Sequence, residues 1–329
     1  MNKIKVFEAF SGYGSQSIAL KNLGIPYEVV AISEIDKYAI KAYEAIHEPT
    51  LNLGDISKIK VEDIPKHDLF TYSYPCQSLS VAGKQEGMIK GKTRSGLLYE
   101  CEKIIEHCRP KYLLLENVKN LVSKKFKPQF DEWLDYLESL GYTSYWKVLN
   151  AKDYGVPQNR ERVFVVSILG EHKPYEFPKP ETTRDIRKYL DDVKNEDLTI
   201  SEKFKQQIKN TNFKKDRYKV DTFNLINGSI EGFRIMDYRY DEGLRIRKNN
   251  LCPTLTTKGT GSLSSTPIIY NNGDFRFLTP REYLKLMGMR DNDIDKIQAA
   301  GISNTQQYKM AGNSIVVDVL EAIFKELFL

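Results

Sequence analysis

Short apolar runs alternate with amphipathic segments through about the first 170 residues, and this rhythm constrains the fold more than any other feature of the chain. It is typical of an α/β protein built around a parallel sheet. The run 163–169 is apolar on nearly every residue, as expected of a strand covered by helices on both faces. The expected strands are residues 4–10, 29–33, 69–74, 112–115, 145–149 and 163–169, and the expected helices include residues 36–47, 96–108 and 129–140.

The character of the chain changes after about residue 170. Three prolines stand within residues 172–180, and the residues that follow are polar and weakly periodic. A compact segment returns after Leu278 and ends in an expected amphipathic helix at about residues 316–328. We therefore predict one domain made of residues 1–176 and 296–329, and a smaller, irregular, mainly β domain made of residues 177–295.

Basic residues are concentrated in the smaller domain. Residues 201–220 hold seven Lys or Arg against two acids. Residues 231–250 hold a second basic cluster interleaved with aromatic residues: Arg234, Arg239, Arg245, Arg247 and Lys248, with Phe233, Tyr238 and Tyr240. A solvated charged surface and a set of phosphate contacts both remain open at this point. The net charge of +5 and the pI of about 8.7 favour a polyanionic partner without requiring one.

Several protein classes are excluded by what the sequence lacks. The N-terminal apolar stretch is too short for a signal peptide and is interrupted by Glu8. No run approaches the roughly 20 apolar residues that span a bilayer. The four cysteines show no CxxC spacing, so neither a disulfide framework nor a zinc site is expected, and we predict a cytoplasmic protein with no metal.

A glycine-containing turn follows the first expected strand. Phe10-Ser-Gly-Tyr-Gly14 stands between a strand and a helix, as in nucleotide-binding turns, where glycine lets the backbone approach a ligand. Glu34 comes twenty residues after Gly14, at the end of the second strand, and is well placed to bind ribose hydroxyls. The turn is either a cofactor site or a structural feature. Ser17 occupies the third glycine position of a dinucleotide motif, which argues against a dinucleotide.

Chemically active side chains stand at the ends of three further strands: Cys76 and Glu116 follow theirs, and residues 158–162 precede the strand at 163–169. Cys76 comes directly after an expected strand, where open α/β sheets bind ligands, and a Gly- and Lys-rich segment suited to a mobile loop follows it. Cys76 is a nucleophile or a buried structural cysteine. Glu116 is an active-site acid or a helix cap. Strand alternation sends Gln158, Arg160 and Arg162 to one face, which requires solvent or an interior polar site.

The order of these motifs resembles the DNA cytosine-5 methyltransferase family. The matching pieces are Phe10-Ser-Gly-Tyr-Gly14, Glu34-Ile-Asp36, Gly54-Asp-Ile56, Pro75-Cys-Gln77, Gly96-Leu-Leu98, Glu116-Asn-Val118, Gln158-x-Arg-x-Arg162, Leu278-Thr-Pro-Arg-Glu282, Leu286-Met-Gly288 and Ala311-Gly-Asn-Ser314. The resemblance covers nearly the whole chain except about residues 172–250. Tyr72-Ser73-Tyr74 and Ser15 depart from the family pattern, but neither departure removes a reacting group.

The resemblance implies a Rossmann-like methyltransferase sheet with helices on both faces, a target-recognition domain, and S-adenosyl-L-methionine (AdoMet) as cofactor. Glu34 would hold the ribose, Ile35 would pack on adenine, and Asp55 would accept from the adenine amino group. The implied cofactor pocket is Phe10, Gly12, Gly14, Glu34, Ile35, Asp55, Leu98 and Asn313. The implied catalytic residues are Cys76, Glu116, Asn117 and Arg162, and the expected DNA contacts are Gln77, Ser80, Lys84, Arg94, Arg160 and Thr254.

The implied chemistry explains why these residue types occur together. Thiolate addition at C6 of cytosine makes C5 nucleophilic, and the charge that develops on N3 and O2 would be stabilised by Glu116 and Arg162. The expected partner is double-stranded DNA with the target base flipped out, bound by a monomer of the stand-alone bacterial or phage type. A cognate restriction endonuclease would be encoded nearby. The alternatives are a tRNA cytosine-5 methyltransferase, whose Cys-Phe-Thr signature is absent here, and a catalytically silent DNA-binding protein.

Overall fold

The computed structural model describes residues 3–75, 79, 87, 94–192, 198–210, 224, 231–240, 242–261, 264, 266–272 and 274–329. The chain folds into two compact units. The first unit consists of Met1–Asn150, Glu161–Pro180 and Val317–Leu329, and the second of Ala151–Arg160 and Glu181–Val316. The boundaries of these units differ from those of the predicted domains, because residues 151–160 and 296–316 belong to the second unit.

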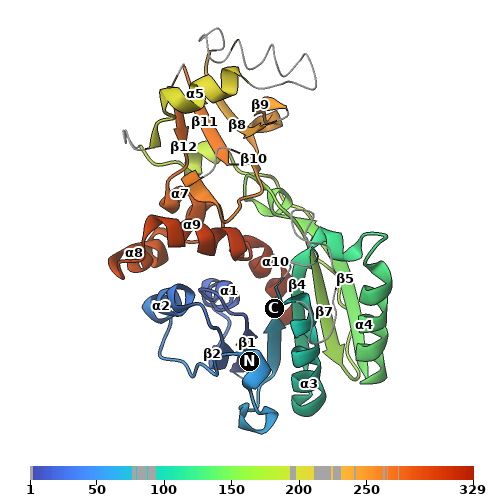
Figure 1. The fold of residues 1–329 in the computed structure, drawn as a ribbon. Coiled ribbons are helices and arrows are strands. Elements are labelled where there is room, and N and C mark those ends of the chain that lie inside the picture. Colours follow the sequence, from blue (N-terminus) through green and yellow to red (C-terminus); the bar gives the residue numbers. More distant parts are fainter. Residues whose placement is uncertain are drawn as a thin grey trace. The chain divides into compact units, whose positions relative to one another are not determined.

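A six-stranded sheet runs through the first unit in the order β2-β1-β3-β4-β7-β5 (Figure 1). Its strands are β1 (Ile4–Ala9), β2 (Tyr27–Ser33), β3 (Leu69–Tyr72), β4 (Tyr112–Val118), β5 (Tyr142–Asn150) and β7 (Glu161–Leu169). The first four strands pair in parallel, as predicted, whereas β7 is antiparallel to both β4 and β5. Residues 151–160, which connect β5 to β7, are too few for the crossover that a parallel neighbour requires.

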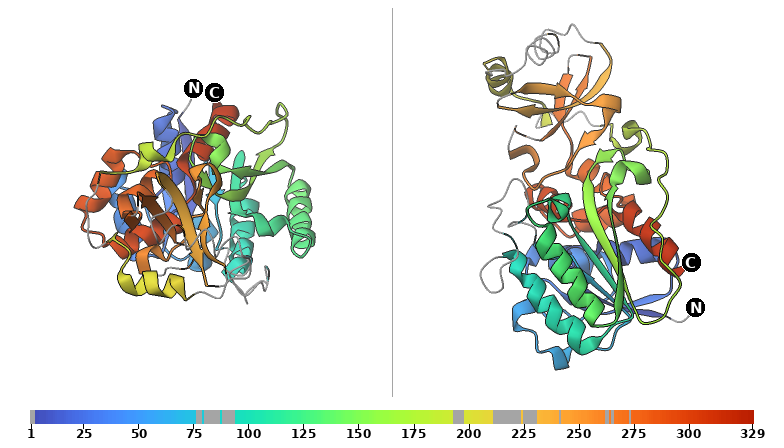
Figure 2. Two further views of the ribbon diagram at one scale, coloured as in Figure 1. Left: turned by 90° about the horizontal axis from the view of Figure 1, so that it is seen from above. Right: turned by 90° about the vertical axis from the view of Figure 1, so that its right-hand side faces the viewer.

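Helices cover both faces of this sheet, which confirms the expected α/β class (Figures 1 and 2). They are α1 (Ser15–Asn22), α2 (Lys37–Ile46), α3 (Leu98–Cys108), α4 (Lys127–Ser139) and α10 (Val317–Phe328). Helix α10 packs against α1, and its sequence position agrees with the predicted C-terminal helix. Asp36 caps α2 by accepting from the amides of Tyr38 and Ala39, which explains why that helix begins directly after the end of β2.

Stacked aromatic rings pack between the neighbouring strands β1 and β3, where Phe7 pairs with Phe70. The ring of Phe70 lies 5.1 Å from that of Phe7 and 5.2 Å from that of Tyr72, and Trp133 of α4 meets Tyr72 edge-on at 6.1 Å. Such pairs contribute about 0.5–1.5 kcal/mol each beyond the area they bury. Tyr72, one of the departures from the family pattern, is thus an aromatic member of the core and the last residue of β3.

The second unit contains a four-stranded antiparallel sheet in the order β12-β11-β8-β9 (Figure 1). Its strands are β8 (Phe233–Arg239), β9 (Gly243–Ile246), β11 (Pro267–Asn271) and β12 (Asp274–Phe277), and a separate short pair joins β6 (Gln158–Asn159) to β10 (Cys252–Pro253). Its helices are α5 (Glu202–Lys209), α7 (Pro280–Lys285), α8 (Asp291–Ala299) and α9 (Asn304–Asn313). Met236, Tyr238, Ile268 and Tyr270 form the centre of its core. The predicted β-rich module is therefore present in this unit.

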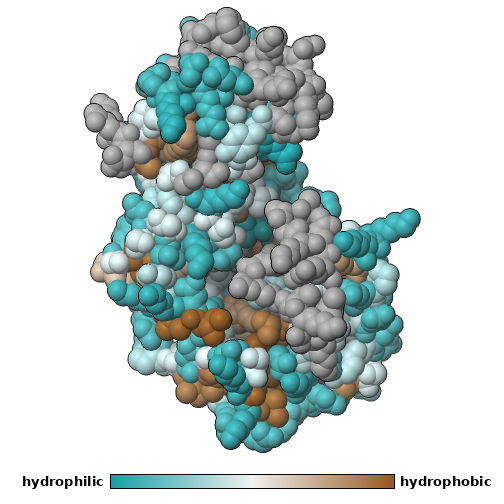
Figure 3. Space-filling model, in the orientation of Figure 1, coloured by the Kyte–Doolittle hydropathy of each residue, from teal (hydrophilic) through white to brown (hydrophobic). Residues whose placement is uncertain are grey.

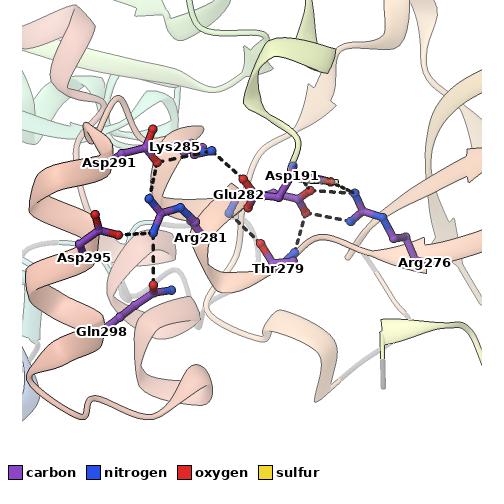
Figure 4. A network of polar contacts seen from close by, with 9 residues as sticks. All are labelled: Asp191, Arg276, Thr279, Arg281, Glu282, Lys285, Asp291, Asp295 and Gln298. Carbon is purple, nitrogen blue, oxygen red and sulfur yellow. Dashed lines mark hydrogen bonds and ion pairs between the residues drawn. The ribbon is translucent and has the colours of Figure 1, made fainter. Parts of the chain in front are cut away.

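A buried carboxylate fastens β12 to α7 (Figure 4). Glu282 is fully buried, and its oxygens accept from Arg276 Nη1 at 2.9 Å and Nη2 at 2.7 Å. It also completes a capping box with Thr279 and accepts from the amide of Asp191 at 2.9 Å. Because a buried charge is tolerated only with full partners, this network sets how α7 begins. The Leu278–Glu282 motif thus has a structural role in the second unit.

None of the helices in the described part of the chain has both the length and the apolar character that crossing a bilayer requires.

Candidate active site

The turn between β1 and α1 has three residues in left-handed backbone conformations, and one of them is not glycine. Phe10, Gly12 and Gly14 all have positive φ, at 55°, 58° and 80°. A Cβ on Gly14 would lie 2.5 Å from His47 Nε2 and 2.7 Å from the ring of Tyr43, so a larger residue cannot fit without displacing them. Phe10 adopts the left-handed conformation although its side chain makes that conformation energetically unfavourable. Strain of this kind is found at ligand-binding turns more often than in ordinary loops.

Glu34 joins this turn to the end of β2. Its Oε2 accepts from the amide of Gly12 at 2.9 Å, and its Oε1 accepts from the amides of Ile35 and Asp36 at 2.8 Å each. The structure therefore brings together Gly12 and Glu34, which are far apart in sequence. Ile35 is 72% exposed, an unusual state for a large aliphatic side chain beside a charged turn. Figure 3 shows apolar surface over the region of the first unit where α2 and the ends of β1 and β2 lie.

Asn52 is a residue of this site that sequence reasoning missed. Its Oδ1 accepts from the amides of Glu34 at 3.2 Å and Gly54 at 2.9 Å, and its Nδ2 donates to the carbonyl of Glu34 at 3.1 Å. Ser33 Oγ adds a bond of 2.7 Å to the carbonyl of Gly54. These contacts place Asp55 near the end of β2. A single Asn in a loop carries no sequence signal for this, because its partners are backbone groups of a distant segment.

Asp55 caps a short 3-10 turn, Ile56–Lys58. Its Oδ1 accepts from the amide of Ser57 at 3.0 Å and from its hydroxyl at 2.8 Å. These hydrogen bonds lower the pKa of the Asp55 carboxyl below its ordinary value. The hydrogen bonds thus favour the ionised form of Asp55, which can accept from an amino group.

A buried glutamate lies beneath the turn, and sequence reasoning also missed it. Glu8 of β1 is fully buried, and Ser17 Oγ of α1 donates to its Oε1 at 2.7 Å. Burial raises the pKa of Glu8 to about 7. Ser17, which occupies the third glycine position of the sequence motif, is therefore the hydrogen-bond partner of a carboxyl group in the core. The signal was available: an acidic residue within an otherwise apolar strand is costly unless it is paired.

Glu116 and Arg162 form an ion pair on neighbouring strands. Glu116 lies in β4 and Arg162 in β7, and the register pairs Val118 with Arg162. Arg162 Nε lies 3.2 Å from Glu116 Oε1, and their side chains are only 17% and 10% exposed. The two residues expected to contact the base are therefore brought together by the structure. A carboxyl and a guanidinium side by side can address adjacent ring atoms of one heterocycle.

Three side chains hold the backbone on either side of residues 76–78. Asn117 Nδ2 donates to the carbonyl of Tyr74 at 3.1 Å, and Ser95 Oγ donates to that of Pro75 at 2.7 Å. Asn120 Nδ2 donates to the carbonyl of Leu79 at 2.6 Å. Ser95 and Asn120 were not among the predicted site residues. The four predicted residues Cys76, Gln77, Ser80 and Lys84 lie outside the described residues.

The remaining predicted residues have varied surroundings. Leu98 is buried in the core of the first unit at the start of α3, and Arg94 begins the 3-10 turn Arg94–Leu97 that precedes it. In the second unit, Asn313 is exposed as the last residue of α9, and Thr254 Oγ1 donates to the carbonyl of Asn159 at 2.7 Å.

Arg160, expected to contact DNA, is only 3% exposed. Its guanidinium donates to the carbonyls of Leu255, Gly312 and Ser314. These partners are backbone groups of the second unit itself.

The basic cluster of β8 and β9 is partly neutralised within the protein. Asp237 is 1% exposed and forms ion pairs with Arg245 and with Arg247, whose Nη2 lies 2.6 Å from Asp237 Oδ2. Arg239 and Lys248 are exposed. Two of the five clustered cations are therefore paired with a buried acid, so the cluster presents less free charge than its composition suggests. Within the described ranges, no group of three or more His, Cys, Asp or Glu has the arrangement of a metal site.

Known proteins resemble this chain over its whole length. The family model for C-5 cytosine-specific DNA methylase matches residues 4–329. The chain is 39% identical to the type II methyltransferase M2.ScrFI of Lactococcus lactis subsp. cremoris, over 99% of each chain. It is 30% identical to the orphan methyltransferase M.SPBetaI of Bacillus phage SPbeta, over 99% of this chain and 98% of that protein.

Solved structures share the fold. The Dnmt2 methyltransferase of S. pombe superposes with a TM-score of 0.73 at 19% identity, covering 99% of this chain and 100% of that one. The methyltransferase EhMeth of Entamoeba histolytica gives a TM-score of 0.75 at 20% identity, covering 100% of this chain and 98% of that one. At such low identity the likeness concerns the fold alone.

Proposed function

The chain belongs to the C-5 cytosine-specific DNA methylase family, and on that premise we propose that it methylates C5 of a cytosine flipped out of duplex DNA, through a covalent bond from Cys76 to C6. As a member it is a DNA (cytosine-5)-methyltransferase. The observation that carries the mechanism is the Glu116–Arg162 pair, 3.2 Å apart at the ends of adjacent strands. It offers one carboxyl and one guanidinium where a cytosine ring would need both.

The turn after β1 fits the cofactor that the family implies. AdoMet would supply an electrophilic methyl group. At Gly12 no atom lies within 4 Å of the place where a Cβ would stand, so the backbone is open there. The Glu34 carboxylate accepts from the Gly12 amide, and the exposed side chain of Ile35 offers an apolar support for adenine. Asp55, whose pKa is lowered by hydrogen bonds from Ser57, would accept from the adenine amino group. Asn313 is also proposed to contact the cofactor.

The proposed chemistry begins with the Cys76 thiolate, which adds to C6 and breaks the aromaticity of the ring. The electron pair displaced from the C5–C6 bond develops as charge on N3 and O2. Glu116 in its protonated form donates a hydrogen bond to N3, and Arg162 donates to O2. After C5 has gained the methyl group, loss of the C5 proton to a base restores the C5–C6 double bond and expels the thiolate.

Duplex DNA is the proposed substrate. Because C6 is inaccessible within stacked base pairs, the target cytosine has to be extruded before the thiolate can reach it. Exposed Arg239 and Lys248 of the second unit are proposed to contact phosphate groups, together with Lys84 and Arg94. Gln77, Ser80 and Thr254 are proposed to contact the target nucleotide and its neighbours. A cognate restriction endonuclease is the proposed functional partner of a monomeric, cytoplasmic enzyme, and sequencing of the adjacent genes would test this.

Transfer of radiolabelled methyl groups tests the proposal. The purified protein is incubated with labelled AdoMet and, separately, with unmethylated duplex DNA and with unmodified tRNA. We expect label on DNA and none on tRNA, and bisulfite sequencing should then locate the modified cytosine. Label on tRNA would replace the DNA substrate by an RNA one, and label on neither would contradict the activity. DNA containing 5-fluorocytosine should trap a covalent complex with the wild-type protein and none with Cys76→Ser.

A further inference from the structure

A buried arginine forms hydrogen bonds with two segments that are proposed to contact different ligands. Arg160 is 3% exposed, and its Nη1 donates to the carbonyl of Leu255 at 3.1 Å. Its Nη2 donates to the carbonyls of Gly312 at 3.0 Å and Ser314 at 2.7 Å. Thr254, proposed to contact the target nucleotide, directly precedes the first of these carbonyls. Asn313, proposed to contact AdoMet, lies between the other two.

Gln158 and Asn159, on the same short stretch, hold the Thr254 side of this arrangement. Gln158 Oε1 accepts from the amide of Leu255 at 3.2 Å, while its Nε2 donates to the carbonyl of Leu286 at 2.8 Å. Thr254 Oγ1 donates to the carbonyl of Asn159 at 2.7 Å. The β6–β10 pair, with Gln158 opposite Cys252, places the two strands in register. The segment that carries Thr254 is therefore fixed both by its backbone and by its side chain.

The segment that carries Asn313 approaches the same residues very closely. A Cβ on Gly312 would lie 2.5 Å from the backbone C of Thr256 and 2.5 Å from the backbone N of Thr257. Contacts this short with backbone atoms leave no room for any other residue at position 312. The two segments are thus in backbone contact, and the guanidinium of Arg160 spans the junction.

We propose that Arg160 is a positioning residue that couples target recognition at Thr254 to cofactor binding at Asn313. The fork of a guanidinium can hold carbonyls of two segments at fixed angles, which an ammonium cannot do. A shift of either segment changes buried hydrogen bonds whose loss is unfavourable. The position of the other segment therefore changes with it. This assignment rests on the function proposed above. It also gives Arg160 a role inside the protein in place of the expected contact to DNA.

The coupling is measured as the ratio of the dissociation constants for S-adenosylhomocysteine without and with DNA. The DNA is a duplex that carries the sequence methylated by the wild-type protein, and titration calorimetry gives both constants. We expect this ratio to be well above one for the wild-type protein. For Arg160→Lys we expect a ratio about tenfold lower, close to one. A merely structural role would lower the melting temperature and leave this ratio unchanged. A lowered melting temperature with the wild-type ratio would therefore overturn the proposal.

Arg276→Lys is the matched control. Arg276 is a largely buried arginine of the same unit that bonds a carboxylate and two carbonyls, so its replacement should destabilise the unit comparably (Figure 4). It should keep the wild-type ratio. A loss of the ratio in Arg276→Lys as large as in Arg160→Lys would contradict a specific role for Arg160.

A double-mutant cycle provides a test that does not require an Arg160 variant to fold. Thr254→Val and Asn313→Ala, alone and combined, should have non-additive effects on kcat/KM, whereas additive effects would overturn the coupling. A wild-type ratio of one would also overturn it while leaving the methyltransferase activity intact. Failure of the proposed function itself is distinguishable, because the wild-type protein would then label no DNA.

Discussion

The buried carboxyl of Glu8 should make the stability of the enzyme depend on pH in a way that one substitution removes. Glu8 is fully buried in β1 beneath the glycine turn, with Ser17 Oγ donating to it at 2.7 Å. Burial raises its pKa from 4.5 to about 7. The folded protein therefore holds this proton more tightly than the unfolded chain does. Its contribution to stability is fully present below about pH 4.5 and is lost as the pH rises through about 7.

The size of this effect follows from the two pKa values. The difference between 4.5 and about 7, at about 1.4 kcal/mol for each pH unit, amounts to about 3 kcal/mol at pH values above 7. About 2.5 kcal/mol of it falls between about pH 5 and pH 8. Glu8→Gln keeps an oxygen that can accept from Ser17 but has no proton to lose. The free energy of unfolding of the variant, minus that of the wild type, should thus rise by about 2.5 kcal/mol over this interval.

Urea denaturation followed by tryptophan fluorescence at a series of pH values measures this difference. Comparing the two proteins at each pH cancels the titration of all other groups. Glu28→Gln, which neutralises an exposed glutamate on the adjacent strand β2, is the control and should keep the wild-type dependence. If Glu8→Gln follows the same pH curve as the wild type, the burial argument for Glu8 is refuted.

Three further substitutions test the site. Cys76→Ser should abolish methyl transfer to DNA while a gel-shift assay still detects binding, and normal turnover would exclude the covalent mechanism. Gly14→Ala should raise the dissociation constant for AdoMet about tenfold or more, because the new Cβ would lie 2.5 Å from His47 Nε2; Gly24→Ala, with positive φ but no atom within 4 Å, should bind AdoMet normally. Asn120→Ala removes the hydrogen bond to the carbonyl of Leu79, three residues after Cys76 in the sequence, and should lower kcat about tenfold with AdoMet affinity unchanged, whereas an unchanged kcat would show that catalysis does not depend on this hydrogen bond.

The strands were predictable because burial on both faces writes continuous apolar runs into the sequence. Their directions were less so: the run at 163–169 is equally apolar in a parallel or an antiparallel strand, and only the short connection from β5 indicates that β7 turns back. The pairing of Glu116 with Arg162 depends on that antiparallel register, which sets Val118 opposite Arg162. The family resemblance implied their roles, but strand periodicity alone could not have placed them together.

Side chains that bind backbone groups were the least predictable part of the site. Asn52, Ser95 and Asn120 each form hydrogen bonds with carbonyls or amides of distant segments. Every residue type has these backbone groups, so the sequence does not show which of them accepts or donates such a bond. Glu8 was different, since an acid within an apolar strand requires a partner. It could have been identified as buried, although the identity of Ser17 as its partner required the structure.

The Gln158-x-Arg-x-Arg162 motif illustrates how a short alternating stretch can serve two units at once. Strand alternation predicted one polar face, which would need either solvent or an interior polar site. The boundary between the units falls between Arg160 and Glu161, so Gln158 and Arg160 bond carbonyls within the second unit while Arg162 pairs with Glu116 in the first. Only one residue, Glu161, therefore separates Arg160, which bonds the segment of Thr254, from Arg162, which is proposed to contact the base.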